Sequence, residues 1–161
     1  MVQILPGCGV EEVASTPAGD HLFDVVDLPL LSEDEQKWFH SYVAKMLYVS
    51  KRTKPECIVA TVFLASRVNK CNTSDIKKLR RLLKYLRPTA DRGIALEMSD
   101  DIIVWVYTDA PYEMHMDCGR SKSGMAVLIG LGTVIVSCRE KHINTKSSTE
   151  AELVALLLFL C

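Results

Sequence analysis

The sequence predicts an α+β fold, because helical spacing of apolar residues dominates before residue 88 and short extended runs dominate after residue 93. A last helical segment follows these runs. With 48% hydrophobic residues in a chain of 161, there is enough apolar material for a packed core. We therefore expect two modules, a helical one and one built mainly of strands, with a seam near residues 88–93.

Residues 1–31 form an irregular acidic lead-in. This stretch contains three prolines and three glycines, which interrupt both helical and strand patterns. Residues 1–36 hold eight acids and no Lys or Arg. We expect the lead-in to be extended, with little secondary structure of its own.

Residues 32–92 predict three helices. Ser32 and Glu35 form a capping box that starts a first helix of roughly 33–50. Pro55 suits the first turn of a second helix, which is apolar nearly all round and should be mostly buried. Thr73 or Ser74 is expected to cap a third helix that ends before Pro88. The core stripe of this third helix comprises Ile76, Leu79, Leu82, Leu83 and Leu86.

Residues 93–161 predict strands followed by a helix. Runs 94–98 and 102–108 flank a turn-like cluster and suggest a hairpin. Runs 125–129 and 133–136 are two more short strands, joined through a Gly-Leu-Gly turn. Ser147 or Ser148 is expected to cap the final helix.

The basic residues are concentrated in one part of the chain. Residues 37–92 hold fourteen Lys or Arg against three acids, although the formal net charge of the whole chain is −1. Such a face binds nucleic-acid phosphates in a salt-sensitive, sequence-independent way, or it serves only for solvation. The candidate phosphate-binding residues on and just after the third helix are Lys77, Lys78, Arg80, Arg81, Lys84 and Arg87.

Two carboxylates in the C-terminal third suggest a metal site. Asp109 ends the apolar run 102–108, and Glu152 lies in the first turns of the final helix. Helical spacing places Glu152 at the edge of a buried stripe, whereas Glu150 should face water. Carboxylate oxygens are the ligands that Mg²⁺ or Mn²⁺ prefers, although a strand-end aspartate is also typical of a solvated turn.

The composition argues against several other classes. The six cysteines have no CxxC pair or zinc-like spacing, so we expect free thiols rather than disulfides or a zinc site. The start of the chain lacks the pattern of a signal peptide, and no apolar run is long enough to cross a bilayer. We expect an intracellular protein, cytoplasmic or nuclear, without a membrane partner.

Several motifs, in a single order, resemble the Pol polyprotein of copia-type retrotransposons. Segments 16–18, 43–48, 51–55 and 79–87 are similar to the end of its reverse transcriptase. The run 107–109, then Arg120-Ser121-Lys122-Ser123-Gly124, then 147–155 look like the following ribonuclease H module. The resemblance extends over nearly the whole chain, roughly from residue 16 to residue 156.

This resemblance implies a ribonuclease H-like mixed sheet that is truncated and has one helix. Asp109 matches the first metal-binding aspartate of the family, and Glu152 matches its helical glutamate. The family's third acid lies on a later strand, and no residue here corresponds to it, so a further polypeptide segment would complete the domain. The implied cofactor is Mg²⁺ or Mn²⁺, and the implied partner is an RNA–DNA hybrid or duplex. Arg120 and Lys122 could contact its backbone, or serve ordinary loop chemistry.

The sequence therefore leaves three hypotheses. The first is a fragment with the tail of a reverse transcriptase (32–92) and part of a ribonuclease H domain (93–161), with little or no hydrolysis of RNA in hybrids by this chain. The alternative is a non-catalytic nucleic-acid-binding remnant that acts through the basic helices. The third is a gene relic without function.

Overall fold

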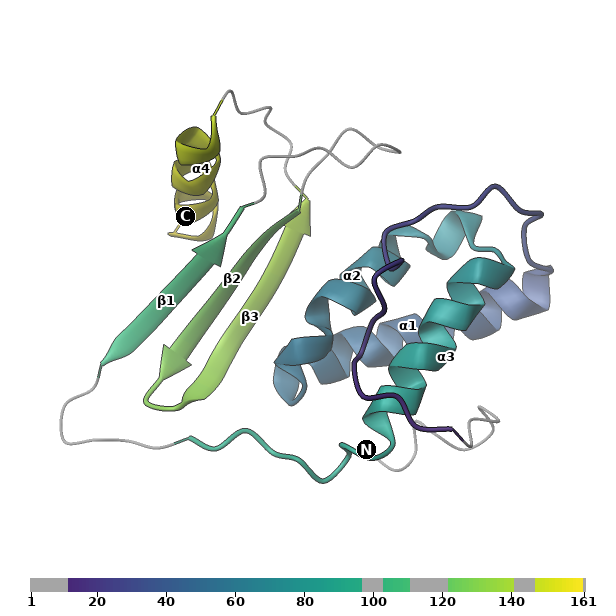
Figure 1. Cartoon of the computed structure of the whole chain (residues 1–161), viewed down its shortest axis with the longest axis horizontal. Coiled ribbons are helices and arrows are strands. Elements are labelled where there is room, and N and C mark those ends of the chain that lie inside the picture. The colour runs from purple at the N-terminus through teal and green to yellow at the C-terminus, as the bar shows by residue number, and fades with distance from the viewer. Residues whose placement is uncertain (1–11, 97–102, 111–121, 141–146, 161) are drawn as a thin grey trace. The chain divides into compact units, whose positions relative to one another are not determined.

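The computed structural model describes residues 12–96, 103–110, 122–140 and 147–160 (Figure 1). The chain divides into two compact units, residues 1–93 and 94–161, here called the helical unit and the sheet unit. Helices come first and an antiparallel sheet follows, which confirms the α+β class. The predicted domain ranges and their roles stay predictions. Within the described ranges, no helix has both the length and the apolar character needed to span a membrane.

Helix α1, Glu33–Arg52, begins at the expected capping box. The backbone N–H of Ser32 donates to Oε2 of Glu35 at 3.1 Å, and the Ser32 hydroxyl donates to the same oxygen at 2.8 Å. These hydrogen bonds lower the pKa of the Glu35 carboxyl. The helix ends where the Thr53 N–H bonds the carbonyl of Val49 at 2.9 Å. The first helix and its cap are as predicted.

The second helix begins with a tighter turn. A 3₁₀ turn η2, Pro55–Cys57, leads into α2, Ile58–Ser66, and a second 3₁₀ turn η3, Val68–Lys70, follows. Pro55 stands at the start, as expected for a residue without an N–H. Val59 is exposed, but most residues of α2 are buried, as expected of a helix that is apolar nearly all round.

Helix α3, Thr73–Leu86, is capped by Asn72 rather than by Thr73 or Ser74. Oδ1 of Asn72 accepts the backbone N–H groups of Ser74 at 2.9 Å and Asp75 at 3.3 Å. The buried Asp75 carboxylate in turn accepts the Asn72 N–H at 3.1 Å. Three consecutive residues of cap-forming type made the sequence ambiguous, and this reciprocal bonding selects the first of them.

One apolar core lies between the three helices. The predicted stripe of α3 is buried at four positions, and Ile76 packs against the cluster from its edge. From α1 and α2 the same cluster receives aromatic and aliphatic side chains. The largest fully buried members are Phe39, Met46, Leu64, Leu79, Leu82 and Leu83.

A buried lysine links the segment after α1 to the segment after α3. The side chain of Lys54 is only 1% exposed. Its ammonium group donates to the carbonyl of Thr89 and to that of Arg92 at 2.8 Å, and Oε1 of Glu56 lies 4.0 Å away. Nothing in the sequence indicates this role, because lysine is rarely buried unless it is paired.

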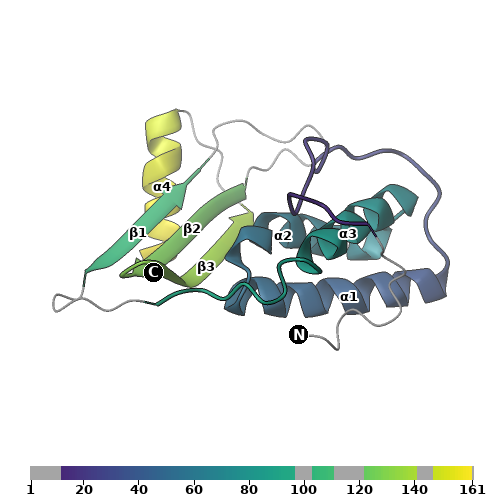
Figure 2. The ribbon, with the colours of Figure 1, turned by 60° about the horizontal axis from the view of Figure 1, so that its bottom comes forward.

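The described lead-in, residues 12–31, has no helix, and its single β-bridge joins Leu30 to Asn72. It nevertheless packs along the helical unit and runs past α3 (Figure 1, Figure 2). Leu22 is buried in the core. The rings of Phe23 and Phe63 pack edge to face, with 5.5 Å between their centroids. The lead-in is therefore irregular, as expected, but it is an integral layer of the helical unit.

The sheet unit contains β1 (Val104–Asp109), β2 (Lys122–Ile129), β3 (Gly132–Glu140) and α4 (Ser148–Leu160). The strands pair in the order β1-β2-β3, antiparallel throughout, and α4 packs on β1 and β2. Three of the four expected strands and the helix after them agree with expectation. The described strands contain no parallel pair, so the mixed character expected of the sheet is not seen in them.

Two details of the predicted strands are wrong or untested. Residues 94–96 are not a strand but lie across the turn between β2 and β3, where an added Cβ at Gly132 would collide with Ala95 and Leu96. The hairpin turn expected at 99–101 lies outside the described residues. The turn after β2 is at Gly130, whose φ of 59° is a left-handed conformation that glycine adopts without strain.

Candidate nucleic-acid interface and carboxylate pair

The basic residues of α3 gather along one side of the helical unit. Lys77, Arg80, Arg81 and Lys84 line a hollow of about 460 Å³, together with lead-in residues 12–15. Their spacing of three and four residues puts them on neighbouring turns of one helix face. Four of the predicted phosphate-binding residues thus share one surface.

Glu12 is the acid within this hollow. Its carboxylate forms an ion pair with the ammonium group of Lys84, and this hydrogen bond lowers the pKa of the Glu12 carboxyl. The Glu12 side chain stays 81% exposed and that of Lys84 30% exposed. An ion pair as exposed as this contributes little to stability, because water screens both charges.

Lys78 differs from its neighbours because its side chain turns toward the lead-in. Its ammonium group donates to the Asp24 carbonyl oxygen and lies 4.8 Å from the centre of the Phe63 ring. Burial lowers the pKa of this ammonium group. Lys78 therefore holds the lead-in in place, and its ammonium group is already bound within the helical unit.

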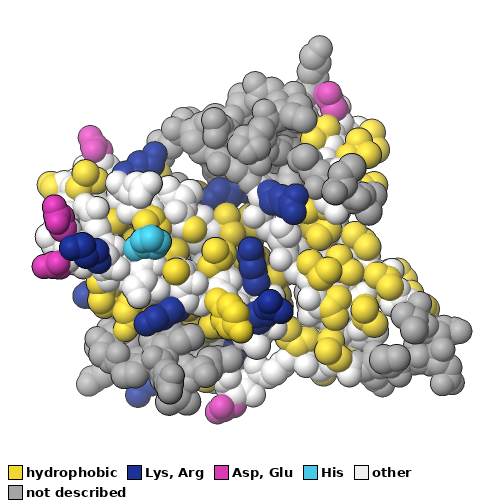
Figure 3. Space-filling view, turned by 180° about the vertical axis from the view of Figure 1, so that it is seen from behind, with side chains coloured by type: hydrophobic (Ala, Val, Ile, Leu, Met, Phe, Trp, Pro, Cys, Tyr) yellow, Lys and Arg dark blue, Asp and Glu magenta, His cyan; other side chains and the backbone are white. Residues whose placement is uncertain are grey.

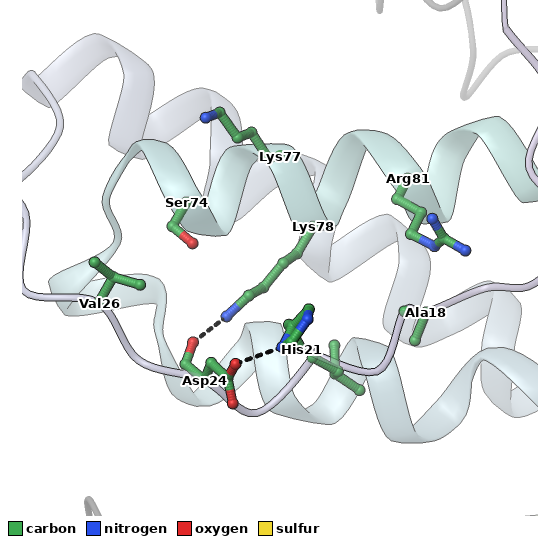
Figure 4. A pocket seen from close by; sticks show the side chains of 10 residues that line it. Ala18, His21, Asp24, Val26, Ser74, Lys77, Lys78 and Arg81 are labelled. Atoms are coloured by element: carbon green, nitrogen blue, oxygen red, sulfur yellow. Dashed lines mark hydrogen bonds and ion pairs between the residues drawn. The ribbon is translucent and has the colours of Figure 1, made fainter.

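A second pocket, of about 480 Å³, lies between the lead-in and α3 (Figure 4). Lys77, Lys78 and Arg81 reach it from the helix, and His21 and Asp24 from the lead-in. Nδ1 of His21 and Oδ2 of Asp24 are 2.8 Å apart. Arg81 lies between the two hollows, and its Nη2 donates to the Thr16 hydroxyl at 2.9 Å.

The remaining predicted contacts are scattered. Arg87 is exposed at the C-cap of α3. Lys122 opens β2 and is half-buried. Burial raises the pKa of the nearby Cys138 thiol, and the charge of Lys122 opposes this rise. Arg120 lies outside the described residues.

Asp109 is the last residue of β1, where it pairs with Gly124 of β2. Its side chain is exposed, whereas Thr108 before it is half-buried and Ala110 after it is buried against α4. The structure therefore confirms a strand-end aspartate open to solvent.

Helix α4 presents a different face to the sheet from the one expected. Ser147 caps it, because its hydroxyl accepts the Glu150 N–H at 3.1 Å. Ala151 and Ala155, one turn apart, are buried, whereas Glu152 and Leu153 are exposed. The predicted stripe through Leu153 and Leu156 is wrong, because small alanine side chains let the helix backbone approach the strands closely. Glu150 is exposed, as expected.

The two carboxylates are of the kind that binds a hard cation. Asp109 and Glu152 stand on elements that pack on one another, β1 and α4. Mg²⁺ is commonly held by one or two carboxylates, with water and substrate phosphates as its other ligands. Across the described ranges, no three His, Cys, Asp or Glu side chains come together in a way that could hold a metal ion.

The contacts between the lead-in and α3 were missed by sequence reasoning. Glu12, Thr16 and Asp24 supply three oxygen acceptors to three of the predicted phosphate-binding residues. A signal was present, since an acidic segment without Lys or Arg precedes a strongly basic one. Opposite charge in two segments does not specify which side chains pair, so only the folded chain shows the contacts.

Three known proteins similar to this chain are from the plant Arabidopsis thaliana. The uncharacterized mitochondrial protein AtMg00810 of Arabidopsis thaliana is 25% identical over 120 residues, which is 74% of this chain and 50% of that protein. The retrovirus-related Pol polyproteins from transposons RE1 and RE2 of the same plant are 28% and 29% identical over 100 residues. Each of these matches covers 62% of this chain and 7% of the polyprotein.

The chain thus spans half the length of the first relative and a small part of the other two. No family model matches the chain, and no solved structure matches it. The chain is a homologue of Arabidopsis retrotransposon Pol polyproteins, consistent with a fragment of a copia-type Pol polyprotein.

Proposed function

We propose that this retroelement fragment binds the phosphate backbone of an RNA–DNA hybrid or duplex through the basic face of α3. The observation that carries the proposal is the hollow of about 460 Å³ in which Lys77, Arg80, Arg81 and Lys84 converge. Four cations on one helix face attract a polyanion regardless of its sequence. Lys77 and Arg80 form no ion pair or hydrogen bond with any other described residue, so both are available to phosphate.

Fluorescence anisotropy with a labelled RNA–DNA hybrid of mixed sequence tests this proposal. The double variant Lys77→Gln/Arg80→Gln should bind roughly tenfold more weakly near 0.1 M salt. A plot of log affinity against log salt has a negative slope, and its magnitude should decrease by about 2, since two phosphate contacts are lost. The matched control is Lys37→Gln/Lys51→Gln, which removes the same charge from α1. Equal losses in both double variants would mean that net charge, and not the α3 face, governs binding.

A second candidate function is metal-dependent hydrolysis of the RNA strand, favoured by the packing of β1 on α4. Asp109 and Glu152 would hold the Mg²⁺ or Mn²⁺ ion, aided by water and the substrate phosphate. The ion, when bound, would activate a water molecule and stabilise the leaving oxygen. Lys122 at the start of β2 and Arg120 are candidate backbone contacts on this side.

The two candidates differ in a cleavage assay. Because no third acid joins the two carboxylates among the described residues, we expect binding of the hybrid without cleavage in Mg²⁺ or Mn²⁺. Cleavage by the wild-type chain that disappears in Asp109→Asn would instead favour the catalytic function. Cleavage that survives Asp109→Asn would point to a contaminating nuclease.

A further inference from the structure

The lead-in lies across the phosphate-binding face as a strap, defined here as residues 12–26. Near its start, Glu12 pairs with Lys84, and the Ala14 N–H donates to the Lys84 carbonyl at 3.4 Å. Further along, the Thr16 hydroxyl accepts from Arg81 at 2.9 Å, and the Asp24 carbonyl accepts from Lys78. The strap therefore engages the cations of α3 one turn after another.

The groups that the strap offers are those that a nucleic-acid backbone offers. A carboxylate, a hydroxyl and a carbonyl present oxygen acceptors to an ammonium group, a guanidinium group and a second ammonium group. Phosphate oxygens bond the same donors. The Glu12 carboxylate in particular lies in the hollow lined by four cations, where a phosphate would find the same partners.

The two ends of the strap are held to different degrees. At the far end, Leu22 is buried in the core, Phe23 meets Phe63, and Nδ2 of Asn72 donates to the Val26 carbonyl at 2.9 Å. At the near end, Glu12 and Thr16 are exposed and make their contacts through single polar groups. The near end can thus detach while the far end stays docked.

We propose that Glu12 occupies the position of a nucleic-acid phosphate on α3, and that the strap competes in cis with nucleic acid for this face. The inference rests on the proposed binding function. Detachment of residues 12–18 uncovers Lys84 and Arg81, and these join Lys77 and Arg80 in binding the backbone. The strap is an internal competitor that lowers the affinity of the intact chain.

Two variants of the strap, each of which replaces one carboxylate by a neutral amide, test the competition. Glu12→Gln should bind a labelled RNA–DNA hybrid about two- to fivefold more tightly than the wild-type chain, because the exposed ion pair with Lys84 is lost. The control is Asp20→Asn, which removes an equal charge from the same segment. Asp20 has no ion pair or hydrogen bond to α3 in the described structure. It should leave the affinity within error of the wild type.

Limited proteolysis supplies a second measurement. Thermolysin cleavage between Val13 and Ala18 should become faster when the hybrid saturates the wild-type chain, because binding displaces the strap. If the hybrid binds beside a strap that stays in place, thermolysin cleavage will be unchanged or slower. That result overturns the inference.

The outcomes separate this inference from the proposed function. Equal affinity of the wild type and Glu12→Gln, or equal gains in Glu12→Gln and Asp20→Asn, overturns competition by the strap and leaves binding by α3 intact. Absence of binding by all three proteins contradicts the proposed function, and the competition with it.

Discussion

Lys54 shows how one residue fixes the path of the chain. Its buried ammonium group donates to two backbone carbonyls beyond α3, those of Thr89 and Arg92. The Thr89 carbonyl also accepts the Arg92 N–H at 3.1 Å, so the lysine joins a turn that a backbone hydrogen bond already closes. Buried carbonyls without donors raise the free energy of the folded state. A single side chain therefore ties the loop before α2 to the last residues of the helical unit.

Replacement of this lysine by an apolar side chain of similar length should be costly. Lys54→Met removes a donor from the Arg92 carbonyl and leaves the Thr89 carbonyl with only the Arg92 N–H, and we expect the free energy of unfolding to fall by about 1–3 kcal/mol. Lys51→Met, at an exposed position of α1, should change it by less than about 0.5 kcal/mol. Urea denaturation followed by circular dichroism measures both. A similar loss in the two variants would show that the hydrogen bonds of Lys54 contribute no more than an ordinary surface lysine.

The buried thiol of Cys57 makes the free energy of unfolding depend on pH in the alkaline range. Burial, followed by the nearby charge of Glu56, raises the pKa of this thiol from 9.0 to about 12. Above pH 9 the unfolded chain loses the thiol proton and the folded chain retains it. The unfolded state is thereby stabilised, so the free energy of unfolding falls by up to about 1.4 kcal/mol per pH unit in this range.

The contribution of Cys57 is isolated by comparison with Cys57→Ala. Between about pH 9.5 and 11, the wild type should lose stability more steeply than the variant, since other groups titrate in both proteins. Denaturation series at several pH values measure the two slopes. Parallel slopes would mean that the thiol is less buried in solution than in the structure.

At the level of elements, the start of α3 depends on one side chain with several partners. Asn72 accepts two N–H groups of the helix and donates to the lead-in at Val26. We expect Asn72→Ala to lower the free energy of unfolding by about 1–2 kcal/mol, or more if the Val26 carbonyl stays without a donor. Thermal and urea denaturation measure the change.

Thr73→Ala is the matched control for the cap. Thr73 is exposed, stands inside the helix and is the residue that sequence reasoning favours as the cap together with Ser74. It should change stability by a few tenths of a kcal/mol at most, since no cap hydrogen bond is lost. A larger effect for Thr73→Ala than for Asn72→Ala would reverse the assignment.

The elements that could be predicted are those with local causes. The capping box at Ser32 and the apolar stripe of α3 depend on residues three and four positions apart, and both are as expected. The face of α4 could not be predicted, because apolar residues surround that helix and the choice of Ala151 and Ala155 is made by the strands. For the carboxylates, the sequence predicted the elements that carry them, but it placed Glu152 at the edge of a buried stripe, whereas the structure exposes it.

At the scale of the whole molecule, the two units differ in how well they cover their apolar side chains. The helical unit has a core of large aliphatic and aromatic residues, whereas the buried cluster of the sheet unit consists of three alanines. Hydrophobic side chains gather on the face of the sheet unit seen in Figure 3. Its exposed large apolar residues include Val104, Trp105, Val106, Tyr107, Ile135, Leu153 and Leu157.

Such a surface favours self-association. Trp105→Lys should weaken association by about tenfold or more, because the apolar area of one indole is no longer removed from water in the associated form. Tyr48→Lys is the control, since Tyr48 is 69% exposed on α1 in the helical unit. Sedimentation velocity at several protein concentrations measures both. Association unaffected by Trp105→Lys would exclude the exposed strand β1 as its origin.

The strap also has a consequence for the order of folding. Its bonds to α3 and the preceding cap join residues 46 to 72 positions apart, whereas the hydrogen bonds within the helices join residues three or four apart. Closing such long loops costs more entropy, so local helices form before distant contacts. We therefore expect α3 to fold with its cations uncovered and to receive the strap afterwards. A nucleic acid present during synthesis would meet that open helix before Glu12 does.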